Sequence, residues 1–185
     1  TPPAWRRDLL TFWFGLDPKQ WWKADPELDE ECRRRFLKTW ARKRELPVES
    51  FLDDPLTALA GVILFDQIPR NVFRGDAEQF ATDHLALAIA KEAVRLGFDD
   101  ELNHDERSFL YMPFEHSEDL ADQKRSVQLF TALGDDYLLG YARKHHDIIE
   151  RFGRFPHRNK MLRRAPRPEE LAGGEVFPWC GSMVS

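Results

Sequence analysis

Features that would place a protein in a chemically defined class are scarce in this sequence. It has only two cysteines, Cys32 and Cys180, which lie far apart and lack the C-x-x-C spacing of a metal or redox pair. No run approaches the roughly 18 apolar residues that a membrane span needs, and the first residues have no apolar signal-peptide segment. We therefore expect a cytoplasmic protein with reduced thiols, no metal site and no contact with a membrane.

The sequence also lacks the short motifs of nucleotide and hydrolytic chemistry. It contains no P-loop, no G-x-G-x-x-G, no G-x-S-x-G and no H-E-x-x-H. A net charge of −5 argues against a general nucleic-acid binder, which would carry a basic face. We expect no cofactor and no nucleic-acid partner.

What is present indicates one globular domain over residues 1–185, ending in an irregular tail over 171–185. The 185 residues are 42% apolar and 12% aromatic, enough for a substantial core. The charges are unevenly spread: residues 151–167 contain seven basic residues and no acid, whereas residues 99–122 contain nine acids and one arginine. The basic block thus has a possible partner within the same chain.

Helical periodicity runs through nearly every segment, and no segment alternates as a half-buried strand does. We predict an all-α fold of antiparallel helix pairs, forming a compact bundle or a stack of hairpins. The expected helices cover residues 5–14, 26–44, 55–68, 76–96, 107–112, 118–133 and 136–152. Pro69 and Pro113 are expected to end the third and the fifth, and Ser117 to cap the sixth.

Three proline turns gather the unusual polar side chains. The first has Asp66, Gln67, Arg70 and Asn71, the second has Glu115, His116 and Ser117, and the third has Arg154, His157, Arg158 and Asn159. Arginine and amide donors suit a phosphate or carboxylate, so we assign ligand binding to Gln67, Arg70, Asn71, Arg154, Arg158 and Asn159. Histidines and acids suit proton transfer, so the candidate catalytic residues are Asp66, Glu115, His116 and His157.

The third turn places positive charge where a helix is expected to begin. His157 and Arg158 follow Pro156, although the helix macrodipole favours acids at an N-terminus. A bound anion would resolve the conflict, and free backbone N–H groups would point at it. Alternatively, Glu115, Glu118 or Asp119 supplies the negative charge within a structural ion-pair network.

Other polar and aromatic residues have plain structural interpretations. His145 lies in the apolar stripe of the last long helix, which predicts a core histidine bonded to a carbonyl group. His146 and Glu150 could bind a metal only if Glu115 and His116 met them from another helix, which no motif supports. The aromatic residues near the N-terminus are expected in the core, the alternative being an exposed groove for a peptide; they are Trp5, Trp13, Phe14, Trp21, Trp22 and Trp40.

Four segments, "LLTFWFG", "FDQIPRNVFRG", "YMPFEHSEDLADQKRSVQLF" and "HHDIIERFGRFPHRN", occur in the order seen in a known family. Over residues 9–170 the chain resembles the bacterial proteins grouped as domain of unknown function 924. The resemblance implies a tetratricopeptide-like, right-handed stack of helix pairs, and it implies no activity, cofactor or catalytic residue.

Two functions remain open from the sequence. The first is a small-molecule site, able to support catalysis, in which the three turns bind an anionic ligand. The second is a scaffold for a protein or peptide partner, in which the same residues form an internal network. Convergence of the turns on an open cavity favours the first, and complete internal pairing favours the second.

Overall fold

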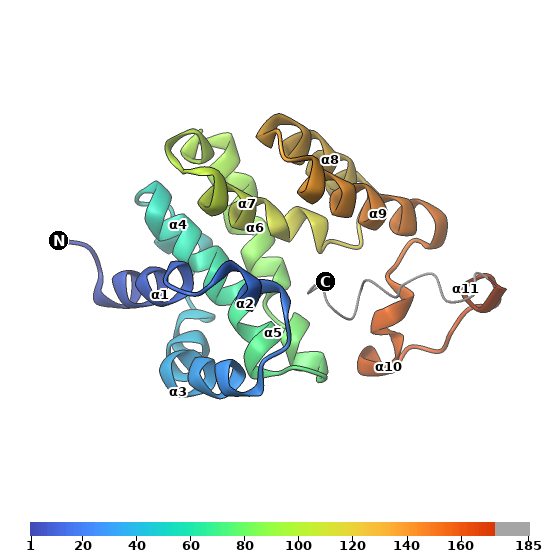
Figure 1. Ribbon diagram of the computed structural model, residues 1–185, viewed down its shortest axis with the longest axis horizontal. Helices are drawn as coiled ribbons and strands as arrows, with labels where there is room; N and C mark the ends of the chain where they lie inside the picture. Colours follow the sequence, from blue (N-terminus) through green and yellow to red (C-terminus); the bar gives the residue numbers. More distant parts are fainter. Residues whose placement is uncertain (173–185) are drawn as a thin grey trace.

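The computed structural model describes residues 1–172, which form helices joined by short turns and contain no strand (Figure 1). This confirms the predicted all-α class. The α-helices are α1 (Ala4–Phe14), α2 (Pro18–Trp22), α3 (Pro26–Lys43), α4 (Pro55–Val62), α5 (Ile68–Val72), α6 (Asp83–Arg95), α7 (His104–Glu115), α8 (Leu120–Leu133), α9 (Asp136–Phe152), α10 (Asn159–Leu162) and α11 (Pro168–Ala172). The 3-10 helices are η1 (Val48–Phe51), η3 (Ala77–Phe80), η4 (Phe98–Glu101) and η5 (Pro156–Arg158), and η2 (Ile63–Gln67) is a π-helix.

Helix ends follow local capping rules in most places. The carboxylate of Asp25 accepts hydrogen bonds from the first backbone N–H groups of α3, as expected from the sequence. Gly153 ends α9 with a positive φ of 75°, a conformation that costs glycine little. The cap of α8 differs from the prediction, because Asp119 rather than Ser117 accepts the N-terminal N–H bonds. Ser117 instead donates to Asp122 over 2.7 Å.

Proline does not end helices where the sequence predicted it would. The helix that starts at Pro55 passes through the π turn η2 and continues past Pro69 to Val72. Pro69 has no N–H to give to the carbonyl of Phe65, and that carbonyl accepts the hydroxyl of Thr82 over 2.7 Å instead. Pro113 likewise lies inside α7, which reaches Glu115.

Three further boundaries differ from the prediction. Residues 76–96 form two elements, η3 and α6, instead of one helix. The short helix α2 was not predicted, although Asp17 and Gln20 form a capping box at its start. At the C-terminus, α11 includes Leu171, which we expected to be irregular, and residues 173–185 lie outside the described part of the chain.

The hydrophobic core is one large cluster with a smaller one beside it. In the large cluster four aromatic rings surround Phe109 at centroid distances of 5.0–5.9 Å, and these belong to Trp13, Phe14, Trp21 and Trp22. Trp13, Trp21 and Trp40 are buried, so these N-terminal aromatic residues build core as predicted. The smaller cluster joins the end of α9 to Phe155.

The helices pack mainly on the next helix in sequence or on the next but one. The pair α8 and α9 lies side by side, α8 also packs on α7, and α4 packs on α6 (Figure 1). The short α10 and α11 follow α9 at one end of the molecule (Figure 1). No helix within residues 1–172 is long and apolar enough to span a membrane. Cys32 is buried and unpaired, and Cys180 lies outside the described residues.

Candidate functional site

The three proline turns meet around His116. Its Nδ1 lies 2.7 Å from Oδ1 of Asp66, which joins the second turn to the first. Its backbone carbonyl accepts a hydrogen bond of 2.9 Å from Nη2 of Arg158, which joins the second turn to the third. The turns are about 40 residues apart in sequence, and the structure brings them together as expected from their composition.

Asp66 and Arg70 form the buried electrostatic centre of this junction. Both side chains are inaccessible to solvent, and Arg70 binds Asp83 through two hydrogen bonds of 2.6 and 2.9 Å. Burial alone would raise the pKa of Asp66, but the charges of His116 and Arg70 and hydrogen bonds from His116 and Gln67 hold it below its ordinary value. Asp66 is therefore an ionised acceptor, and Arg70, predicted as an anion clamp, is occupied by Asp83.

The π turn explains how Asp66 reaches this position. It widens the helix at Ile63–Gln67, and Arg70 donates to the carbonyl of Asp66 over 2.7 Å. π turns within α-helices often occur at functional sites. Without the extra residue of the π turn, the Asp66 side chain would point to a different side of the helix.

His116 is arranged as a neutral imidazole with one oriented nitrogen. Burial lowers the pKa of His116, against the attraction of Asp66. The neutral ring donates Nδ1–H to the Asp66 carboxylate, which leaves Nε2 as a proton acceptor. Nε2 is buried and has no hydrogen-bond partner within the described residues.

Arg158 differs from Arg70, the other buried arginine, because no acid lies within ion-pair distance of it in the described structure. Only 4% of this residue is exposed, and its guanidinium lies 4.5 Å from the ring centroid of Phe80 and 4.7 Å from that of Phe155. Burial lowers the pKa of Arg158 to about 10, because the more distant charges of Asp83 and Glu118 do not compensate for it. Its Nε is buried and lacks a hydrogen-bond partner among residues 1–172.

Arg158 and His116 line an open cavity of about 320 Å³, here called the turn cavity. Its other lining residues come from η3, α6, α7, α10 and the loop before α8, and they are Phe80, Asp83, His84, Leu87, Pro113, Ser117, Glu118 and Leu162. Five of them were not predicted as site residues, namely Phe80, Asp83, His84, Leu87 and Leu162. No motif marks them, because they reach the cavity only through helix packing.

Glu118 and Glu170 are the acids that form ion pairs with the basic block in the described part of the chain. Glu118 accepts a bond of 2.6 Å from the backbone N–H of Phe155 and pairs with Arg164 at 2.9 Å. Glu170 pairs with Arg154 at 2.7 Å and accepts a bond of 3.0 Å from Asn159. Arg154 and Asn159, which we predicted to bind a ligand, are thus engaged by a carboxylate of the same chain.

The helix start predicted after Pro156 is not an anion site of the expected kind. The segment forms a 3-10 turn of three residues, η5, followed by α10 with four residues. Such short elements carry little macrodipole. The charge of Arg158 is directed toward the turn cavity instead.

The remaining predicted site residues lie away from the cavity lining. Asn71 donates to Asp29 over 2.9 Å, and Gln67 donates to Asp66 over 2.9 Å. Glu115 is buried, and burial together with the charge of Asp66 raises its pKa to about 8. His157 packs against Phe155 at 5.5 Å between ring centroids.

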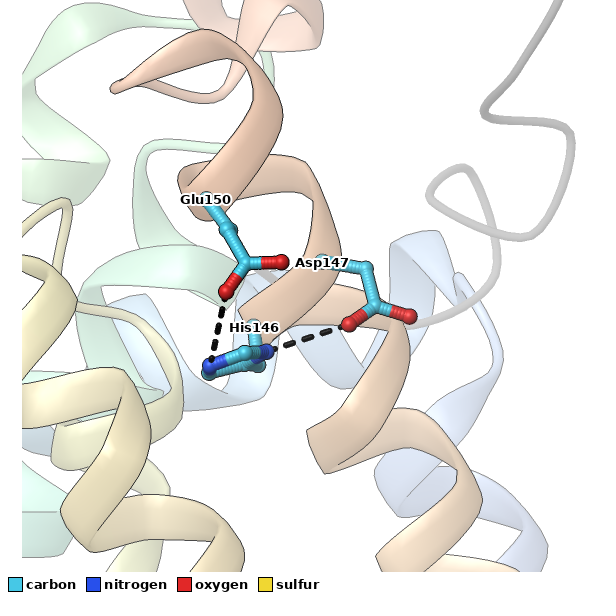
Figure 2. Close-up of side chains that lie close together, drawn as sticks. All are labelled: His146, Asp147 and Glu150. Carbon is cyan, nitrogen blue, oxygen red and sulfur yellow. Dashed lines mark hydrogen bonds and ion pairs between the residues drawn. The ribbon is translucent and has the colours of Figure 1, made fainter.

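The other two histidines considered from sequence lie on α9. His145 is fully buried and its Nδ1 contacts the carbonyl of Tyr141 at 2.7 Å, as predicted for a core histidine. Figure 2 shows His146, Asp147 and Glu150 projecting from one helix, their possible ligand atoms within 4.8 Å of one another. Asp147 contacts Nδ1 of His146 and Glu150 faces Nε2, so the two carboxylates approach different ring nitrogens. Glu115 and His116 are not part of this group.

A second hollow, of about 450 Å³, lies between α1 and α3. Trp5, Phe12 and Phe36 line it together with Arg35, whose charge is paired with Glu31. It therefore offers aromatic surface but no uncompensated arginine.

Fold and site together define an all-helical protein in which a buried ion-pair network borders an open polar cavity. The chain belongs to the family described as "Bacterial protein of unknown function (DUF924)", which matches residues 9–173. A solved structure of a protein of unknown function from Agrobacterium tumefaciens, ATU0120, is similar, with a TM-score of 0.85 and 42% sequence identity. The similarity covers 93% of this chain and 97% of that one. No curated protein matches the chain.

Proposed function

We propose that this protein binds a small molecule bearing a carboxylate or a phosphate in the turn cavity, with Arg158 as the anion-binding side chain. The observation that carries the proposal is the burial of the Arg158 guanidinium at an open cavity with no ion-pair partner in the described structure. The neighbouring Arg70 and Arg164 each pair with a carboxylate through two hydrogen bonds. Of these three arginines, Arg158 is the one without a carboxylate partner within residues 1–172.

A buried charge without a partner is costly, and this cost gives the proposal its physical basis. Burying a cation is tolerated when it is paired or hydrogen-bonded. The hydrogen bond to the carbonyl of His116 and the faces of two aromatic rings offset part of the cost of burying the Arg158 charge. A ligand anion would supply the missing charge, and a planar carboxylate matches the guanidinium geometry.

In the same proposal, His116 is the candidate general base, and Nε2 is its proton-accepting atom. Asp66 orients its ring through Nδ1, and the ring is neutral, which is the form a general base requires. Asp66 acts through His116 and does not line the cavity.

Binding can be tested by following the melting temperature in a panel of anions, with chloride at matched ionic strength as the reference. A ligand that binds only the folded state raises this temperature. Acetate, butyrate, hexanoate and inorganic phosphate are suitable probes. We expect at least one of them to stabilise the wild type and Lys160→Ala, and to leave Arg158→Gln unchanged.

Lys160→Ala is the matched control because Lys160 is an exposed cation of the same segment. It corrects for general salt effects on the protein surface. The proposal fails if no anion stabilises the wild type beyond chloride, or if Arg158→Gln responds as the wild type does.

A tetratricopeptide-like scaffold for a peptide is the second candidate function. The aromatic hollow between α1 and α3 favours it, since aromatic side chains are common anchors at interfaces. A peptide ligand there would protect amides of α1 and α3 from hydrogen exchange. An anion in the turn cavity would instead protect amides near Ser117 and Arg158.

A further inference from the structure

We infer that the ligand of the turn cavity is a monocarboxylate with an apolar body, and not a dianionic phosphate. This inference rests on the proposed function and narrows it to one class of substrate. Two independent observations lead to it: the balance of charges around the cavity and the composition of its walls.

Arg158 can pair with one added negative charge, and the acids around the cavity, which include the ionised Asp66 behind His116, oppose a second. Asp83 and Glu118 both line the cavity, and each is already paired, with Arg70 and Arg164 respectively. Arg158 is thus the one cation on the cavity lining that has no carboxylate partner within residues 1–172. A monoanion would match it, whereas the second charge of a dianion would be repelled by Asp83 and Glu118.

Glu115 and His116 do not change this balance. The pKa of Glu115 is raised to about 8 by burial and by Asp66, and burial lowers the pKa of His116. Both groups are therefore mainly neutral near pH 7. His84, the other histidine on the lining, is exposed.

Part of the cavity lining is apolar, and this part is here called the apolar wall. Phe80, Leu87, Pro113 and Leu162 come from four different elements and line the same space. A volume of about 320 Å³ is at the lower end of the range for small-molecule sites and leaves room for more than a carboxylate. An aliphatic or aromatic body would cover this wall, and each methylene that becomes fully buried would tighten binding by about fourfold.

The experiment is an NMR titration of the ¹⁵N-labelled protein at about pH 7.5, where Glu115 is still mainly neutral and inorganic phosphate is mainly a dianion; the other probes are acetate, butyrate and hexanoate. We expect affinity to increase from acetate to hexanoate, and phosphate to bind more weakly than butyrate. The shifts should centre on residues near Ser117 and Arg158. Arg158→Gln should abolish them, and Lys160→Ala should not.

A second variant tests the contribution of the apolar wall to affinity separately from that of the Arg158 charge. Leu162 is half-buried, so Leu162→Ser is expected to fold and to keep the affinity for acetate. This variant should lose part of the increase in affinity from acetate to hexanoate. An unchanged gain in this variant would overturn the assignment of the wall.

The possible failures are distinguishable. Phosphate binding more tightly than every carboxylate, or equal affinities along the carboxylate series, would overturn this inference and leave the proposed anion site standing. Absence of Arg158-dependent binding by every probe would overturn both.

Discussion

At the scale of single residues, burial decides which side chains of the turns carry charge. Asp66 and Glu115 are both buried acids, yet their pKa values move in opposite directions. Asp66 has Arg70 and two hydrogen-bond donors beside it, whereas Glu115 has the negative Asp66 as its charged neighbour. Sequence alone treats the two acids alike, because each stands within three residues of a proline.

The raised pKa of Glu115 predicts a pH-dependent stability. The unfolded chain loses this proton near pH 4.5 and the folded protein near pH 8, so the free energy of unfolding falls as pH rises between these values. Glu115→Gln removes the effect. We expect its stability relative to wild type to improve by more than about 1.4 kcal/mol, the value of one pKa unit, from pH 5 to pH 8.

Urea denaturation at the two pH values measures this difference. Glu101→Gln is a control, because Glu101 is exposed at the end of η4. A stability difference between Glu115→Gln and wild type that is the same at both pH values would show that Glu115 is ionised in the folded protein.

At the scale of elements, tertiary hydrogen bonds let proline remain within the helix that carries Asp66. The hydroxyl of Thr82, a fully buried residue, donates to the carbonyl of Phe65 and accepts from Nε1 of Trp40 at 3.0 Å. It therefore satisfies two buried groups at once, one from the π turn and one from α3. The π turn depends on a residue 17 positions away in sequence.

Replacing Thr82 by valine keeps the side-chain shape and removes both hydrogen bonds. Each unsatisfied buried group costs about 1–3 kcal/mol, so we expect Thr82→Val to lower the free energy of unfolding by about 2–4 kcal/mol. Chemical denaturation measures this change in the free energy of unfolding. Thr131→Val, at an exposed site on α8, should change stability by less than about 0.5 kcal/mol. Similar small effects for both variants would contradict this role of Thr82.

At the scale of the whole molecule, the C-terminal elements are held mainly by carboxylates. The small cluster around Phe155 is separate from the main core. Glu118 connects the following segment to the loop before α8, and Glu170 joins residues within that segment to one another. Glu170 accepts hydrogen bonds from Arg154, Asn159 and the backbone of Arg167. Because this segment carries Arg158 to the turn cavity, its attachment positions the proposed site.

Glu170→Gln should loosen this end of the molecule selectively. We expect faster hydrogen exchange in residues 153–172 and unchanged exchange in α3 and α4, because local opening reflects local contacts. Hydrogen exchange with mass spectrometry provides the measurement, and the exposed neighbour Glu169→Gln is the matched control. Equal protection in both variants would mean that apolar packing alone holds the segment.

Much of the secondary structure could be predicted because its causes are local. The periodicity of α9, the cap at Asp25 and the glycine after Phe152 act within a few residues. The errors at Pro69, Pro113 and Ser117 have a common origin. Local rules predict that a proline ends a helix and that a serine caps one. In the folded protein, Thr82 bonds the carbonyl that Pro69 leaves free, and Ser117 donates to Asp122 instead of capping α8.

The sequence by itself determined the helical class, the family and the composition of the three polar turns, because these follow from periodicity and from residue types. Tertiary structure alone decided which arginine is available to a ligand. Arg70, Arg154 and Arg158 have the same side chain and similar neighbours in sequence, but carboxylates reach only the first two. An ion pair depends on distances between helices, and those distances are set by packing of the whole core.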